Sequence, residues 1–298
     1  MEKCTLCPRN CKKNRFLGER GVCGQTNVLK VARAALHYWE EPCISGEKGS
    51  GAIFFSGCAL HCVFCQNRQI ANGTAGKEIS GERLTEICLE LQEKGANNIN
   101  LVTPGHFVPQ IIPAIECAKE QGLSIPIVYN TGSYENVDTI KSLEGIVDIY
   151  LPDFKYMSPE LSAAYSHAPD YSKTAKEAIA EMVRQTGEAA FYEREGQELM
   201  KRGVIVRHLL LPGQAADSKE IIRYLYGTYG DKIFLSIMNQ FTPLSQLTEY
   251  PELNRKVTEE EYEELVDYAI ELGVENGFIQ EGGTAEESFI PEFDCEGV

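Results

Sequence analysis

The sequence lacks two features, and each absence excludes a class of protein. No apolar run approaches the ~18 residues needed to span a membrane, and the first residues, which include Glu2 and Lys3, lack the apolar core of a secretory signal. Basic side chains are scarce, since 28 Lys and Arg stand against 44 Asp and Glu and give a net charge of -16. Binding of nucleic acid needs a basic surface. We therefore expect a cytoplasmic protein with neither a membrane nor a nucleic acid as partner.

Disulfide bonds are not expected either, although the chain contains 11 cysteines. An odd number of thiols cannot pair completely, and the cytosol keeps thiols reduced. Metal binding or catalysis is the better interpretation of these cysteines. The length of 298 residues with 43% apolar side chains is sufficient for one large domain.

From residue 51 onward, short apolar segments alternate with segments of helical periodicity, which is typical of βα units and a parallel sheet. We expect six strands, at residues 51–57, 98–103, 125–131, 146–154, 204–211 and 232–239. We expect helices at residues 82–94, 109–121, 134–143 and 218–229, another near 173–186 within an insertion at 156–202, and a last one that opens with a capping box at Thr258.

Six βα units are too few to close an eight-stranded barrel. The sequence therefore predicts an α/β fold, a partial, open (β/α)6 TIM-like barrel over residues 51–298. Residues 1–50 are rich in Cys, Gly and Lys with little periodicity, and we expect them to form a metal-binding N-terminal extension. In such a barrel the site lies at the carboxyl ends of the strands.

Three cysteines, Cys58, Cys62 and Cys65, directly follow the first expected strand. A compact loop can bring their thiols to one point, and thiolate suits zinc or iron–sulfur chemistry. No fourth cysteine lies nearby. A 4Fe–4S cluster held by three thiolates would leave one iron open to an outside ligand. Three buried or zinc-binding cysteines with a fourth ligand elsewhere are the competing interpretation.

A second group, Cys4, Cys7, Cys11 and Cys23, has the spacing Cys-x2-Cys-x3-Cys-x11-Cys, which is typical of a metal site. Zinc would make this group a structural site, and a second iron–sulfur cluster would make it an electron relay or a substrate site. We favour zinc slightly, because the spacing matches no iron–sulfur pattern in full. Cys43 could replace one of the four or cover the main cluster.

The Cys-x3-Cys-x2-Cys spacing, with Phe64 before the last cysteine, resembles the motif of the radical S-adenosylmethionine (SAM) superfamily. Further segments are similar to the uncharacterised homologues of pyruvate formate-lyase activating enzyme, and they extend the resemblance over nearly the whole chain. These segments are Cys4-Thr-Leu-Cys7-Pro-Arg-Asn-Cys11, Glu40-Glu41-Pro42-Cys43-Ile44-Ser45-Gly46, Asp148-Ile-Tyr-Leu-Pro-Asp153-Phe-Lys155, and Val206-Arg207-His208 followed by Leu211-Pro212-Gly213.

The resemblance implies a barrel of the radical SAM type with a 4Fe–4S cluster and SAM as cofactors. The reduced cluster would cleave SAM into methionine and a 5'-deoxyadenosyl radical, which abstracts hydrogen from a substrate. The activating enzymes point to a glycine of a partner glycyl radical enzyme as the target, and a small molecule or another polypeptide is the alternative. A low-potential donor of the flavodoxin or ferredoxin type would supply the electron. An iron–sulfur electron-transfer module is the alternative from another class.

Phe64 in the cysteine loop and a set of residues at the strand ends are expected to contact the cofactor. The set is Thr103, Pro104, Gly105, His106, Asn130, Asp153, Lys155, Arg207 and Asn239. The segment 103–106 stands where the superfamily commonly has a Gly-Gly-Glu stretch that binds the SAM amine. Here the acid is absent, so backbone carbonyls could bind the amine, with His106 as a polar anchor. Capping of the next helix is the alternative role of His106.

The side chains of Asp153 and Lys155 point to the same side of a strand. They could pair with each other as a buried salt bridge, or with the carboxylate and ribose of the cofactor. Arg207 could hold a carboxylate through two nitrogens. The amide of Asn239 suits contacts with ribose or adenine.

Overall fold

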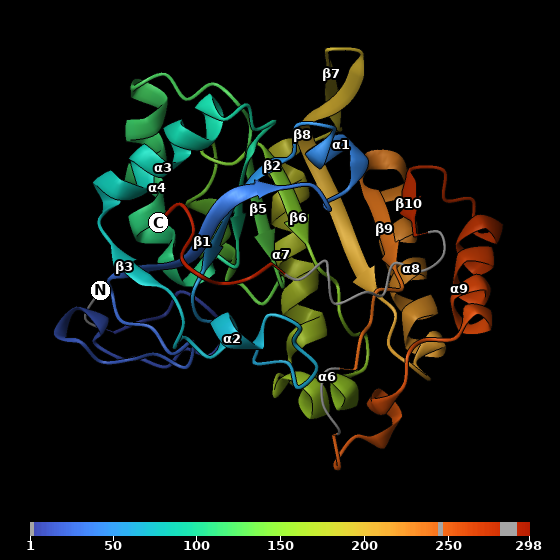
Figure 1. Cartoon of the computed structure of the whole chain (residues 1–298). Coiled ribbons are helices and arrows are strands. Elements are labelled where there is room, and N and C mark those ends of the chain that lie inside the picture. Colours follow the sequence, from blue (N-terminus) through green and yellow to red (C-terminus); the bar gives the residue numbers. More distant parts are fainter. Residues whose placement is uncertain (1–2, 244–246, 281–290) are drawn as a thin grey trace.

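Ten strands from the described residues, 3–243, 247–280 and 291–298, form one sheet in the computed structural model (Figure 1). The strand order is β10-β9-β8-β6-β5-β4-β2-β1-β3, with β7 paired to β8. The strands are β1 Leu29–His37, β2 Ser50–Phe55, β3 Lys77–Ile79, β4 Ile99–Val102, β5 Ile127–Thr131, β6 Ile149–Pro152, β7 Ala190–Arg194, β8 Gln197–Leu209, β9 Phe234–Met238 and β10 Gly277–Ile279. The sheet curves without closing, so the open barrel that the sequence predicts is confirmed.

The six expected strands correspond to β2, β4, β5, β6, β8 and β9, which pair in parallel with their neighbours in this order. Every residue of β2, β4, β5 and β6 is buried. Strands covered on both faces must be apolar throughout, which is why short apolar runs located them in the sequence.

Helices cover the outer face of the sheet (Figure 1). Those on this face are α3 Gly81–Glu93, α4 Val108–Glu120, α5 Val137–Lys141, α7 Tyr171–Thr186, α8 Ala215–Tyr229 and α9 Glu259–Glu271. The short helices α1 Pro42–Ser45 and α2 Arg68–Ala71 lie at opposite ends of the barrel, and α6 Pro159–Ser166 packs against α7. Short 3-10 turns occur at Arg15–Leu17, Gly105–Phe107, Gly230–Lys232 and Pro251–Asn254. The capping box is confirmed, because the Thr258 hydroxyl accepts from the Glu261 N–H and the Glu261 carboxylate accepts from the Thr258 N–H.

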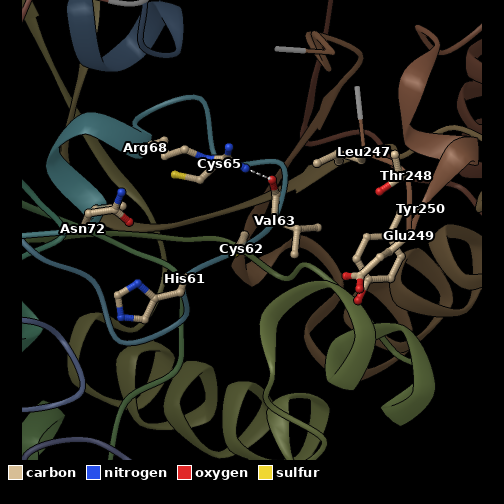
Figure 2. A pocket seen from close by; sticks show the side chains of 11 residues that line it. His61, Cys62, Val63, Cys65, Arg68, Asn72, Leu247, Thr248, Glu249 and Tyr250 are labelled. Carbon is tan, nitrogen blue, oxygen red and sulfur yellow. Dashed lines mark hydrogen bonds between the residues drawn. The ribbon is translucent and has the colours of Figure 1, made fainter. Parts of the chain in front are cut away.

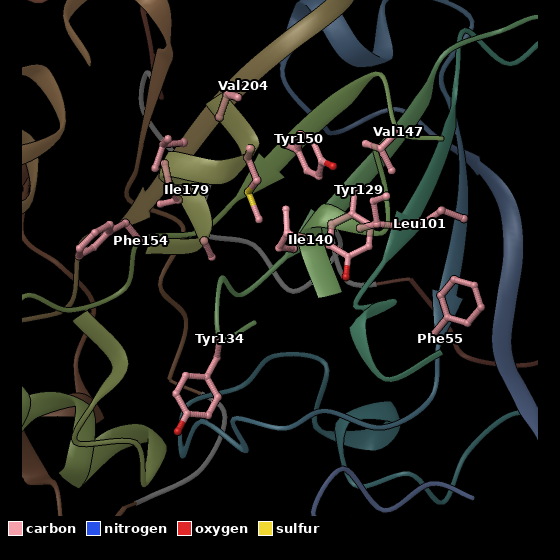
Figure 3. Packing of buried hydrophobic residues seen from close by; sticks show 14 of the residues in the cluster. Phe55, Leu101, Tyr129, Tyr134, Ile140, Val147, Tyr150, Phe154, Ile179 and Val204 are labelled. Atoms are coloured by element: carbon pink, nitrogen blue, oxygen red, sulfur yellow. The ribbon is translucent and has the colours of Figure 1, made fainter. Parts of the chain in front are cut away.

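Figure 3 shows the core between the sheet and its helices, where Phe55, Leu101 and Tyr129 from the strands lie near Ile140 and Ile179 from α5 and α7. All five are fully buried. This packing fixes the strands, and therefore the positions of the loops that follow them.

Strand β1 was not predicted. It pairs antiparallel with β2, from His37 opposite Ser50 to Val31 opposite Phe55, and also with β3. A register shift between Val31 and Arg33 interrupts the pairing. The shift breaks the alternation of buried and exposed residues by which a strand is recognised in sequence. No helix in the described part of the chain is long and apolar enough to cross a membrane.

Candidate active site

The three-cysteine loop begins where β2 ends, and Cys58, Cys62 and Cys65 all line one cavity of about 410 Å³. Gly57 starts the loop with a φ of 96°. A Cβ at this position would also lie 2.5 Å from the backbone oxygen of Cys23, so only glycine fits. The turn directs the following thiols across the carboxyl ends of the strands.

The three cysteines are half-buried. Burial raises the pKa of Cys58 and raises that of Cys65 to about 12, against the opposing effect of the Lys155 ammonium. Cys62 Sγ accepts a hydrogen bond of 3.0 Å from the Ser166 hydroxyl. Buried thiols of this kind become thiolates when a metal group replaces their protons.

Three soft donors around one cavity fit an iron–sulfur cluster in their chemistry. Among the described residues, no three ligating side chains form a group that could hold a single metal ion. The assignment of Cys58, Cys62 and Cys65 as cluster ligands therefore stays a prediction, as does that of the N-terminal cysteines.

Phe64 fixes the loop from inside. Its ring meets Tyr156, Tyr165 and Phe241 edge-on, at centroid distances of 6.5, 6.4 and 5.9 Å. Such edge-to-face contacts are favourable beyond the area that they bury. Phe64 also lines the cavity, as expected of a residue near the cofactor.

Four of the predicted cofactor residues meet in one network inside the cavity. Asp153 binds Lys155 (Nζ to Oδ2, 2.6 Å) and Arg207 (Nε to Oδ1, 3.1 Å). Arg207 also donates to Asn130 Oδ1 at 2.7 Å and pairs with Glu40 Oε2 at 3.0 Å. Burial works to raise the pKa of Asp153, but its two cationic partners outweigh burial and lower it. The predicted pairing of Asp153 with Lys155 is thus present.

The segment after β4 divides between the cavity and the interior. Thr103 lines the cavity, whereas Pro104, Gly105 and His106 are not among the described residues that line it. The His106 ring lies 2.8 Å from the backbone oxygen of Ser56, and burial lowers its pKa to about 3. The 3-10 turn Gly105–Phe107 turns this ring into the protein.

Asn239 is likewise not among the described lining residues, and its backbone N–H donates to Gln280 Oε1 at 2.9 Å. Gln240 and Gln280, the latter after β10, reach the cavity wall in this region. The sequence pointed to the end of β9 but not to the strand β10 beside it.

Glu135 is an acid in the cavity wall that the sequence did not suggest. It is 6% exposed and accepts hydrogen bonds from Thr131 (2.8 Å) and Tyr129 (3.3 Å). Burial raises its pKa to about 7. A Cβ added at Gly105 would overlap its carboxylate, so the acid packs against the turn after β4. Glu135 stands four residues after the end of β5. This position near a strand end was the only feature of the sequence that could have indicated a role for it.

The N-terminal cysteines lie together beside the three-cysteine loop. A Cβ at Gly21 would be 3.4 Å from the sulfur of Cys11 and from that of Cys23. Cys4 exchanges backbone hydrogen bonds with Lys12 and Lys13, at 3.0 Å each.

Cys43 lies elsewhere. It is buried with Ile44 against Val128, Ile149 and Leu151, in an apolar cluster on β5 and β6. It therefore belongs to neither cysteine group, and the two roles considered for it in sequence are not supported.

The outer side of the cysteine loop borders a second hollow of about 520 Å³ (Figure 2). His61, Cys62 and Cys65 form one wall, and Leu247 and Tyr250 lie opposite. The loop therefore separates a surface cleft from the inner cavity.

Comparisons with known proteins agree with this geometry. The model of the Radical SAM superfamily matches residues 52–225. The chain is similar to an uncharacterized protein of Methanocaldococcus jannaschii, with 28% identity over 274 residues, 90% of this chain and 74% of that protein. It is also similar to the pyruvate formate-lyase-activating enzyme of Clostridium pasteurianum, with 25% identity over 182 residues, 58% of this chain and 66% of that enzyme.

Two solved structures share the fold. The crystal structure of SuiB from Streptococcus suis bound to the precursor peptide SuiA has a TM-score of 0.51 and 14% identity, with 75% of this chain and 46% of that chain covered. The structure of HydG, a maturase of the FeFe-hydrogenase, has a TM-score of 0.50 and 16% identity, with 74% and 49% covered. The chain thus spans about half the length of these proteins, and at such identities the likeness concerns the fold alone.

Proposed function

The chain belongs to the Radical SAM superfamily, and we propose its function on this basis. The matched residues, 52–225, make up more than half of the chain. Membership implies a 4Fe–4S cluster and SAM, which together supply a 5'-deoxyadenosyl radical that abstracts hydrogen from a substrate. The chain is therefore a radical SAM enzyme, and its residues bind the cofactors, exclude water and orient the substrate.

Cys58, Cys62 and Cys65 are the proposed cluster ligands. The observation that carries this proposal is that all three line the cavity that also contains the network around Asp153. Lys155 supports the ligands electrostatically, because a buried ammonium favours nearby thiolates. The outer cleft beside Cys62 and Cys65 is the proposed approach for a flavodoxin-type or ferredoxin-type electron donor.

Glu135 is the proposed partner of the SAM amino group. The acid of the superfamily's usual Gly-Gly-Glu stretch is absent after β4, and the Glu135 carboxyl packs against Gly105 in that same turn. The described contacts give Glu135 neutral hydrogen-bond donors, and an ammonium ion would supply the missing charge. Thr103, Asn130, Lys155 and Arg207 are proposed to hold the rest of SAM.

The first candidate substrate is a glycine in a partner glycyl radical enzyme, as the similarity to the Clostridium pasteurianum activating enzyme suggests. A small molecule is the second candidate, because the inner cavity has a volume of about 410 Å³ and has the buried acids Glu41 and Glu135 in its wall. The four N-terminal cysteines are proposed to bind zinc or a second cluster.

The test is SAM cleavage by the anaerobically purified chain after reconstitution with iron and sulfide. We expect 5'-deoxyadenosine and methionine after reduction, loss of both in Cys58→Ala, and their retention in Cys117→Ala. Cys117 is a matched control because it lies on α4, where Gln121 donates to its sulfur at 3.1 Å. A chain with an intact cluster and no cleavage would contradict the proposal and favour an electron-transfer module.

A glycyl radical target has its own readout. The reduced enzyme, SAM and a candidate glycyl radical enzyme should together give the doublet of a glycyl radical in electron paramagnetic resonance. A candidate that stays silent while 5'-deoxyadenosine forms is not the substrate.

A further inference from the structure

The segment Glu40-Glu41-Pro42 forms the floor of the inner cavity. All three residues line it, and Pro42 is the first residue of the short helix α1. In Figure 1, α1 lies near the start of β8, at the end of the barrel opposite to α2 and the cysteine loop. The cavity therefore runs from the cysteines at one end to two acids at the other.

The two acids differ in their partners. The Glu40 carboxylate accepts from Arg207 at 3.0 Å and from Asn100 Nδ2 at 2.9 Å. Glu41 is 8% exposed, and its Oε2 has no hydrogen-bond partner among the described residues. The Ser236 side chain interacts with the Glu41 carboxyl group. Glu41 thus lines the cavity and keeps one buried carboxyl oxygen without a hydrogen-bond partner in the described part of the chain.

The nearest cation, Arg207, attracts Glu41 electrostatically, but its described hydrogen bonds go to other residues. Arg207 directs Nη1 to Glu40, Nε to Asp153 and Nη2 to Asn130, so each of its three nitrogens has an acceptor. The described residues that line the cavity carry four carboxyl groups against two cationic side chains, namely Glu40, Glu41, Glu135 and Asp153 against Lys155 and Arg207. Burial of a carboxyl oxygen without a hydrogen-bond partner is unfavourable in free energy, and a cation bound next to it offsets that free energy.

We propose that Glu41, with Ser236 beside it, forms a subsite for the ammonium or guanidinium group of a small-molecule substrate. This inference rests on the proposed function and narrows its second candidate to amine-bearing compounds. SAM itself does not account for the subsite, because its amino group would lie at the cysteine end, beside Glu135. The cation bound at Glu41 would hold the substrate between the floor and the radical.

The floor is closed below, which favours a small molecule over a protein chain. Cys43 and Ile44 pack against Val128, Ile149 and Leu151 beneath the acids. A polypeptide backbone cannot continue between these packed side chains. The cavity above them, of about 410 Å³, has the size of a small-molecule site.

Trp39 provides the measurement, because it is the single tryptophan of the chain and lines the same cavity. The probes are pentylammonium and its neutral analogue 1-pentanol, titrated into the full reconstituted chain in its oxidised state with SAM present. Saturable fluorescence changes are expected, with pentylammonium bound roughly tenfold more tightly than 1-pentanol. Glu41→Gln should remove this preference, and Glu47→Gln, on the exposed turn after α1, should keep it.

Equal binding of the two probes, a preference that survives in Glu41→Gln, or no saturable change would each overturn the inference. If Glu41→Gln does not fold, as judged by its thermal transition, the comparison of the two probes on the unchanged chain still decides. Formation of 5'-deoxyadenosine after reduction of the same sample separates the two failures. If SAM is cleaved but pentylammonium is not preferred, only the proposed subsite is ruled out. If SAM is not cleaved, the proposed function itself is ruled out.

Discussion

The His61 Nε2 lies 2.7 Å from the backbone oxygen of Val22, so the three-cysteine loop directly contacts the N-terminal cysteine segment. Gly57, next to Cys58, likewise approaches the backbone of Cys23. The two cysteine segments are therefore in direct contact. We expect each of them to stabilise the conformation of the other.

Arg9 is expected to be the main link between these segments. It donates to the backbone oxygens of Ala59 at 2.9 Å, Ser166 at 2.8 Å and Leu60 at 3.5 Å. Arg9→Met should lower the free energy of unfolding by about 2–3 kcal/mol, because hydrogen bonds from a charged group are lost. It should also lower the iron bound per chain after reconstitution. Lys12→Met, at an exposed site, is the control, and equal iron content in both variants would contradict this role.

The N-terminal cysteines are expected to bind a metal distinct from the main cluster. Elemental analysis of the purified chain should give one zinc beyond four irons, or about eight irons if a second cluster is present. Cys23→Ser should lose that additional metal, and Cys117→Ser should not. A wild-type chain with four irons and no other metal would show that Cys4, Cys7, Cys11 and Cys23 bind none.

Asp153→Asn is expected to be strongly destabilising. The substitution leaves Lys155 and Arg207 without their shared carboxylate in a buried setting, which typically costs 3–5 kcal/mol. Urea unfolding measures this loss. Asp138→Asn is the matched control, since Asp138 is 95% exposed and pairs with Lys141 at the surface, where an ion pair contributes little. A similar small effect in both variants would show that the network is not important for stability.

Glu135→Gln is expected to raise the KM for SAM about tenfold while the cluster content stays unchanged, because a charged partner of the SAM amine becomes neutral. The readout is 5'-deoxyadenosine formation at varied SAM concentration, with Glu177→Gln, an exposed site on α7, as the control. An unchanged KM would assign the amine to the backbone carbonyls after β4.

The fold was predictable because buried parallel strands leave apolar runs, and the cysteine spacing located the site. The network around Arg207 was less accessible. Glu40 meets Arg207 across 167 positions of sequence, and no local pattern indicates which distant charges will pair. Local backbone conformation also decides where a side chain points. The turn after β4 carries Thr103 at a φ of 57° and sends His106 inward, which periodicity alone does not reveal.

His208 should make the stability depend on pH. It alternates with Arg207 on β8, so its ring points away from the network, to the backbone oxygen of Phe154 (2.7 Å) and the Ser218 hydroxyl (2.8 Å). Burial lowers its pKa to about 4. Between pH 4 and 6.5 the folded state therefore binds fewer protons than the unfolded state, so stability rises with pH and is lost on acidification.

Over the whole window the contribution of His208 is about 3 kcal/mol, of which about 2 kcal/mol falls between pH 5 and 6.5. Urea unfolding at these two pH values should show this slope in the wild-type chain and a smaller one in His208→Gln. Some slope should remain, because burial also lowers the pKa of His106. His167→Asn, at an exposed site, should keep the full slope. If the stability of His208→Gln and that of the wild type depend equally on pH, His208 does not gain a proton on unfolding, and this prediction is wrong.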